Sequence, residues 1–180
     1  MKVFVGVDLS AEARAAIAAS LSDVDMPGKP APPKNWHITL RYIGAMDDVS
    51  VDRLLAGLDE AELGDPFALR VSGLGAFPKP ARAAVLYVGL DAGSERLAAL
   101  AETVQDVVDG IGLGREDRPF VGHVTLARIR PPVDVRRLIA DGDLPPVPIP
   151  VDEVTVFESV QVADGTEYRP IERFLLRDDR

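Results

Sequence analysis

The chain has no cysteine, which excludes disulfide bonds and thiolate metal sites. No apolar run approaches the ~20 residues of a membrane-spanning helix, and the opening segment, which Asp8 interrupts, does not resemble a signal peptide. Cations are outnumbered, and the net charge of −9 opposes binding of long nucleic acid through a broad basic face. We therefore expect a cytoplasmic protein without membrane contacts. A short anionic ligand in a locally basic pocket remains compatible with this charge.

Apolar residues, in contrast, are abundant. They make up 47% of the 180 positions, so a full core is expected and disorder is not. A chain of this length forms one domain, or two small lobes that share a cleft. We interpret residues 1–180 as a single domain. The sequence implies no protein partner, and we expect a monomer.

Hydrophobic patterns divide the chain into strands and helices. Strands are predicted at Lys2–Leu9, Trp36–Ile43, Phe67–Leu74, Ala84–Leu90, Phe120–Ile129, Val151–Val162 and Thr166–Leu176. Helices are predicted from Ser10, as N-cap, to Leu21, and at Val49–Leu63, Ser94–Ile111 and Asp134–Ala140. The segment Asp23–Lys34, with its four prolines, is predicted to be a loop, and Asp164-Gly165 a hairpin turn.

The two histidines of the chain begin two copies of one tetrapeptide frame. These are His37-Ile38-Thr39-Leu40 and His123-Val124-Thr125-Leu126. With this composition, the second histidine would be followed by Thr and Leu at the same offsets by chance roughly one time in 340. The match therefore indicates a shared role for the two motifs.

Both motifs occupy the same place in a weak internal repeat. Each half of the chain reads strand, helix, motif strand, helix, strand. A pseudo-twofold axis between the halves would place the two motif strands face to face across a cleft. The runs of strands with helices on one side predict an α+β fold with largely antiparallel sheets.

Alternation along a strand places the polar residues of each motif on one face. His37 and Thr39 share a face, as do His123 and Thr125, while the aliphatic residues between them point into the core. Two imidazoles can divide acid and base roles, one deprotonating water and the other protonating a leaving oxygen. Threonine hydroxyls donate hydrogen bonds to anionic oxygens. A phosphodiester flanked by both pairs suits this layout.

Arginine would add bidentate neutralisation of a phosphate, and the candidates are Arg41, Arg128 and Arg130. Strict alternation puts Arg41 on the face of His37 but puts Arg128 opposite His123. Arg128 reaches the site only if its strand twists, bulges or ends before it.

Other interpretations of the histidines carry less weight. A single strand histidine beside threonine is usually a half-buried, hydrogen-bonded pair, but two matching copies that contain every histidine favour function. A zinc site would need further ligands from Asp or Glu, and the helical His-x-x-x-His spacing is absent. We therefore predict no metal and no cofactor. Asp178 and Asp179 are interpreted as solvated charge.

The residues around both motifs resemble the 2H phosphoesterase superfamily, and within it the RNA 2′,3′-cyclic phosphodiesterases, also described as 2′–5′ RNA ligases. The resemblance runs over nearly the whole chain in the same order. It rests on the opening strand Val3–Leu9, on Asn35–Gly44, Gly73–Pro78 and Arg118–Arg128, and on Phe157-Glu158-Ser159 with Gly165 and Tyr168.

The resemblance implies a bilobal fold with two pseudo-symmetric antiparallel sheets, helices on the outer faces and a central cleft. It implies metal-independent hydrolysis of 2′,3′-cyclic phosphates on RNA 3′ ends or nucleotides to 2′-phosphomonoesters. By the match, His37 is the acid that protonates the departing 3′ oxygen and His123 is the base that deprotonates water. Thr39, Thr125 and Arg128 would hold phosphate oxygens. The symmetry of the motifs leaves the acid and base roles open to exchange.

Substrate identity stays open at the level of sequence. Phe4, Trp36 and Tyr168 are candidates to stack on a terminal base, although packing inside the lobes is the more common role for such residues. The same chemistry would serve a 2′–5′-linked oligonucleotide or a nucleotide-derived cyclic phosphate. A non-catalytic binder of RNA 3′ ends is the alternative from another class, but binding alone does not require two titratable groups.

Overall fold

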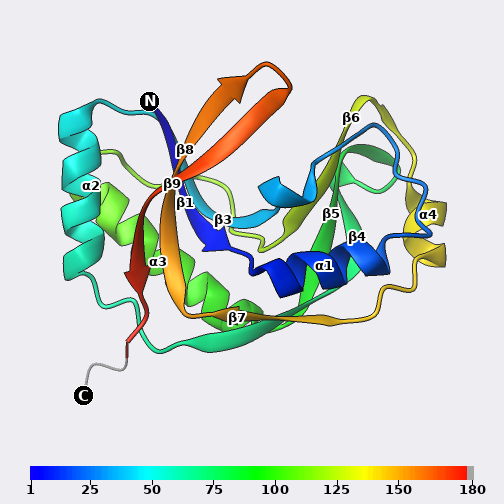
Figure 1. Cartoon of the computed structure of the whole chain (residues 1–180), viewed down its shortest axis with the longest axis horizontal. Helices are drawn as coiled ribbons and strands as arrows, with labels where there is room; N and C mark the ends of the chain where they lie inside the picture. The colour runs from blue at the N-terminus through cyan, green and yellow to red at the C-terminus, as the bar shows by residue number, and fades with distance from the viewer. Residues whose placement is uncertain (178–180) are drawn as a thin grey trace.

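Two antiparallel sheets with helices packed around them form the fold in the computed structural model, which describes residues 1–177 (Figure 1). The expectation for Asp178 and Asp179 lies outside the described residues. The first sheet has the order β3-β1-β8-β9, with β1 (Lys2–Asp8), β3 (His37–Ala45), β8 (Glu153–Val162) and β9 (Gly165–Leu175). The second has the order β2-β6-β5-β4-β7, with β2 (Lys29–Pro30), β4 (Phe67–Lys79), β5 (Arg82–Ala92), β6 (Val124–Val133) and β7 (Val147–Val151).

The helices lie where the sequence predicts them, within a few residues. They are α1 (Ala11–Ser20), α2 (Asp48–Glu60), α3 (Ser94–Gly110) and α4 (Arg136–Asp141), with a 3₁₀ turn η1 (Pro33–Asn35) before the first motif. Ser10 caps α1, because its hydroxyl accepts a 3.1 Å hydrogen bond from the Ala13 N–H. α3 packs against β3 and β4, and α2 packs on α3 at the left of Figure 1. Within residues 1–177, the helices are too short or too polar to cross a membrane.

One apolar core extends through both sheets. It includes Val5 and Ile38 of the first sheet, Val88 and Val124 of the second, and Leu97 of α3, each at most 3% exposed. Ile38 and Val124 are the second residues of the two motifs. The aliphatic side of each motif strand therefore faces this core, as alternation predicts, and leaves histidine and threonine on the opposite face.

The two sheets share one arrangement of strands. Each motif strand, β3 or β6, pairs with the strand that opens its half of the repeat, β1 or β5. Those strands pair in turn with β8 and β4. The structure thus confirms the predicted α+β fold with two pseudo-symmetric antiparallel sheets.

The strand predicted to begin at Phe120 begins only at Val124, so His123 lies just before it. The other main differences between the predicted elements and the structure lie in proline-rich segments. β7, with Pro148 and Pro150, lies in a stretch predicted to be a loop, and it pairs with β4 at the sheet edge, where a residue without an N–H is tolerated. β2 lies inside the predicted loop Asp23–Lys34 and pairs with β6. β4 continues to Lys79, past the end predicted for it at Leu74.

Candidate functional site

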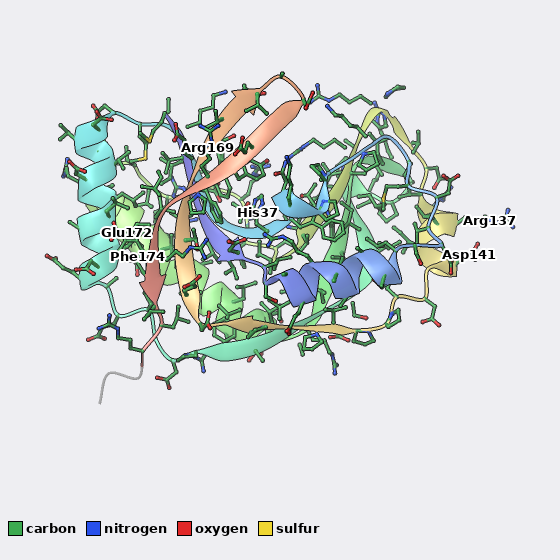
Figure 2. The ribbon with its side chains drawn as sticks, viewed as in Figure 1. His37, Arg137, Asp141, Arg169, Glu172 and Phe174 are labelled. Carbon is green, nitrogen blue, oxygen red and sulfur yellow. The ribbon has the colours of Figure 1, made fainter. Side chains whose placement is uncertain are left out.

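The two motifs meet in one cavity of about 550 Å³. His37 and Thr39 of β3 line it together with His123, just before β6, and Thr125 of β6. His37 lies near the middle of the molecule (Figure 2). A second hollow, of about 520 Å³ between α2 and the end of β9, contains neither motif. The twin polar faces predicted from alternation therefore share one cavity.

Both imidazoles are held in the same orientation by the backbone. Nδ1 of His37 lies 2.8 Å from the Asn35 carbonyl oxygen, and Nδ1 of His123 lies 2.8 Å from the Val121 carbonyl oxygen. Because a carbonyl only accepts, Nδ1 of each ring carries a proton, which leaves Nε2 as the nitrogen that gains or loses one. Nε2 of His37 lies 2.9 Å from the Thr39 hydroxyl oxygen.

Aromatic rings pack against each imidazole. The His37 ring lies 4.7 Å from that of Phe4 and edge-on to Tyr168 at 5.0 Å, between ring centroids. The His123 ring lies 5.0 Å from that of Phe77 and 5.2 Å from that of Tyr87. These contacts restrict the orientation of each imidazole and contribute to its burial.

Burial is the main influence on both imidazoles. Desolvation lowers the pKa of His37 and of His123 below the ordinary 6.5, although a hydrogen bond to the backbone opposes it in each case. Among charged neighbours, Asp8 raises the pKa of His37 whereas His123 and Arg14 lower it. Arg128 lowers the pKa of His123. Both rings are therefore biased toward the neutral form, and their charged neighbours differ.

Each motif strand carries a bulge directly after its threonine. Thr39 pairs with Gly6 but Arg41 pairs with Val5, so Leu40 is an extra residue. In β6 the equivalent extra residue is Leu126. A bulge shifts alternation by one position, which reverses the faces of the residues that follow it.

Comparison with known proteins identifies the family of the chain. A family model described as the 2′-5′ RNA ligase superfamily matches residues 14–162. The chain belongs to this superfamily. A protein named RNA 2′,3′-cyclic phosphodiesterase from Aeropyrum pernix is 30% identical over 84% of this chain and 88% of its own length. Another of that name from Thermus thermophilus is 31% identical over 99% of this chain and 92% of its own length.

Solved structures of similar proteins share the fold. A Thermus thermophilus protein of known crystal structure is 30% identical with a TM-score of 0.79, and the alignment covers 100% of both chains. Escherichia coli LigT complexed with 3′-AMP is 23% identical with a TM-score of 0.81 over 98% of both chains. At that identity, the likeness to LigT concerns the fold alone.

The bulges place the two arginines of this superfamily member differently from strict alternation. Strict alternation predicts Arg128 on the face opposite His123. The bulge in β6 reverses this, so Arg128 is exposed and lines the cavity. Strict alternation predicts Arg41 on the face of His37, but the bulge in β3 turns it inward, where it is only 7% exposed. Tyr42 takes the position in β3 equivalent to Arg128, lines the cavity and is 52% exposed.

Arg41 is a structural cation rather than a cavity residue. Its guanidinium donates to the side-chain oxygen of Gln105 in α3 and to the carbonyls of Tyr42 at 3.1 Å and Gly114 at 3.0 Å. These bonds join β3 to α3 and to the loop that leads to the second motif.

We expect Arg41→Ala to lower the free energy of unfolding by about 2–3 kcal/mol, because buried acceptors lose their donor. Urea unfolding followed by the fluorescence of Trp36, the single tryptophan, measures this change. Arg137→Ala is the matched control, since that side chain is 95% exposed. Unchanged stability together with weaker substrate binding would contradict this structural role and indicate that Arg41 contacts the substrate.

Other predicted site residues are divided by the structure. Phe4 and Tyr168 line the cavity, with Phe4 3% exposed beneath the His37 ring. Trp36 does not line it, because it is 5% exposed within the core. Arg130 is exposed but lies outside the cavity lining. Neither Trp36 nor Arg130 is placed to contact a ligand in the cavity.

Sequence patterns missed several cavity residues besides Tyr42. Lys29 and Lys34 come from the segment predicted to be a loop, while Ser159, Gln161 and Thr166 come from the β8–β9 hairpin. The side-chain amide of Asn35 donates to the Thr166 carbonyl at 2.8 Å, so the hairpin is tied to the turn that orients His37. The prolines around Lys29 predict a loop, so the sequence does not indicate that this residue pairs with β6.

Proposed function

We propose that the protein is a metal-independent RNA 2′,3′-cyclic phosphodiesterase, which hydrolyses cyclic phosphates on RNA 3′ ends or nucleotides to 2′-phosphomonoesters. The proposal rests on two imidazoles that line one cavity with titratable Nε2 atoms. Each of these histidines lies two residues before a threonine. Relatives named RNA 2′,3′-cyclic phosphodiesterase support the substrate class.

The reaction requires one proton to leave a water molecule and another to reach a sugar oxygen. Nε2 of His123 accepts the proton of the attacking water as its oxygen bonds to phosphorus. The bond from phosphorus to the 3′ oxygen breaks, and Nε2 of His37 donates a proton to that oxygen. The products are a 2′-phosphomonoester and a 3′ hydroxyl, and a proton transfer through solvent restores both rings.

The charges around the rings support this assignment of roles. Asp8 lies opposite His37 in the pairing of β1 with β3, and its carboxylate favours the protonated ring that an acid requires. The Arg128 guanidinium disfavours a charged His123 and so favours the neutral ring that a base requires. Burial opposes the charged form of both rings. His123 and Arg14 also oppose it at His37, where Asp8 is the largest influence among the charged neighbours.

The phosphate is proposed to be held by Thr39, Thr125 and Arg128. The two threonines line the cavity from strands of different sheets, and their hydroxyls can donate to different non-bridging oxygens. Arg128 supplies a positive charge whose planar donors suit a phosphate. Because the charge of the phosphate is greatest in the transition state, these donors stabilise it there most strongly.

The direct test uses purified protein in EDTA with adenosine 2′,3′-cyclic phosphate. We expect turnover to 2′-AMP, separated from 3′-AMP by chromatography. Activity only after added metal would contradict the metal-independent mechanism. Binding without a product at any pH would instead favour a non-catalytic role.

We expect both histidines of the free protein to titrate below pH 6.5, because burial disfavours their charged forms. A bound nucleotide monophosphate should raise both values, since its negative charge favours imidazolium. NMR titration of the imidazole ring protons tests this. The two histidines give two sets of signals, and the set that disappears in His37→Ala belongs to His37. The pH optimum of kcat/KM, which reports the free enzyme, should accordingly lie below 6.5. Titration of both rings above 6.5 in the free protein would contradict the dominance of burial.

A further inference from the structure

The cavity is positively charged although the chain is acidic. Its charged lining residues are Lys29, Lys34 and Arg128 against the single acid Asp164, whereas the net charge of the chain is −9. Lysine is rare here, with four in the sequence, and two of these line the cavity. Charge of this sign gathers where an anion binds.

Two of these cations are direct neighbours across a strand pair. Lys29 of β2 pairs with Arg128 of β6 in antiparallel register, so their side chains leave the same face of the sheet from Cα atoms about 5 Å apart. Like charges in directly opposed positions destabilise a sheet. Within residues 1–177, neither takes part in a salt bridge, so this repulsion has no partner carboxylate to offset it.

The segment that carries Lys29 is built to hold it there. Gly28 has a positive φ of 72°, and a Cβ at that position would lie 2.4 Å from the Arg128 carbonyl oxygen. The Ala31 N–H donates to the Leu126 carbonyl at 2.8 Å. Prolines at 27, 30, 32 and 33 restrict the backbone on both sides. The backbone that carries Lys29 therefore loses little further freedom when the side chain binds a ligand.

We infer that Lys29 forms a second phosphate subsite, which takes the phosphodiester one nucleotide upstream of the cyclic phosphate. This inference rests on the proposed function, in which Arg128 holds the reacting phosphate. Lys29 lies one strand further from the second motif than Arg128 does. In this inference its ammonium group therefore meets the next phosphate rather than the reacting one. The preferred substrate is then an oligonucleotide end rather than a mononucleotide.

An edge-strand lysine has another common use, which is to discourage pairing with other chains. If Lys29 had only that use, its removal would affect substrates of every length equally. If Lys29 forms a phosphate subsite, its removal affects only substrates that carry the upstream phosphate. Removing the charge should also leave the fold intact, because Lys29 is exposed and its repulsion with Arg128 is relieved.

The experiment compares kcat/KM for adenosine 2′,3′-cyclic phosphate and for the dinucleotide ApA that ends in the same cyclic phosphate. With the dinucleotide, Lys29→Ala should lose about tenfold, mainly through KM, as expected for one charge-assisted contact. With the mononucleotide it should match the unaltered protein. The slope of log kcat/KM against log salt for the dinucleotide should become shallower by about 0.7, the value for one phosphate contact on a single strand.

Lys29→Arg should retain the preference for the dinucleotide, and Lys79→Ala, an exposed lysine outside the cavity lining, is the matched control. Equal losses on both substrates would place Lys29 at the reacting phosphate and overturn the subsite. An unchanged kcat/KM on both substrates would also overturn the subsite and leave Lys29 only its use in protecting the sheet edge. Failure of the unaltered protein to hydrolyse either substrate would instead reject the proposed function.

Discussion

Replacing His37 or His123 with alanine is expected to lower kcat by about 10²–10⁴-fold, the range for a positioned proton transfer. The two rings act on one reaction, so the double variant should lose little more than either single variant. Steady-state hydrolysis of the cyclic phosphate in EDTA measures both effects. Thermal unfolding monitored through Trp36 fluorescence controls for loss of the fold.

A change of leaving group separates the two roles. The p-nitrophenyl group departs from a phosphodiester as a stable anion and needs no proton from an acid. With such a substrate, His37→Ala should recover much of its lost rate, whereas His123→Ala should remain impaired because water must still be deprotonated. If only His123→Ala regained its rate with this substrate, His123 would be the acid and His37 the base. Equal losses by both variants on both substrates would contradict separate acid and base roles.

Arg128→Ala is expected to lower kcat/KM by about 10–100-fold, because a charge-assisted contact with the phosphate contributes about 1.5–3 kcal/mol. Arg128→Lys should recover part of this loss, since lysine keeps the charge without the bidentate donors. Kinetics with the mononucleotide are suitable, as its one phosphate reports on this contact.

Arg130→Ala is the matched control for Arg128. It removes an exposed arginine from the same strand, two residues further on and outside the cavity lining. Its kcat/KM should equal that of the unaltered protein. Equal losses in the two variants would mean that general positive charge, and not the position after the bulge, determines binding.

Short-range patterns predicted the parts of this site that depend on alternation alone. The pairs His37 with Thr39 and His123 with Thr125 follow from a period of two, and the repeated order of elements anticipated that the strands would meet. Ser10 was identified as a cap from its residue type and position. These features are local, and a single sequence contains them.

The features that were missed depend on partners distant in the chain. An extra residue in a strand can be recognised only from its register with a neighbour, and Leu40 and Leu126 are ordinary core residues in sequence. Arg41 was therefore placed on the wrong face. Lys29 and its short strand were hidden by the flanking prolines, since nothing nearby reveals that β6 offers an edge to pair with.

The matched bulges give the cavity a direction. Two nearly equivalent halves would by themselves accept a phosphodiester equally well either way round. At corresponding positions, however, one half presents the phenol ring of Tyr42 and the other presents the guanidinium of Arg128. A ligand with an aromatic end and an anionic end meets unlike surroundings in its two orientations, and one position of each strand contributes to that difference.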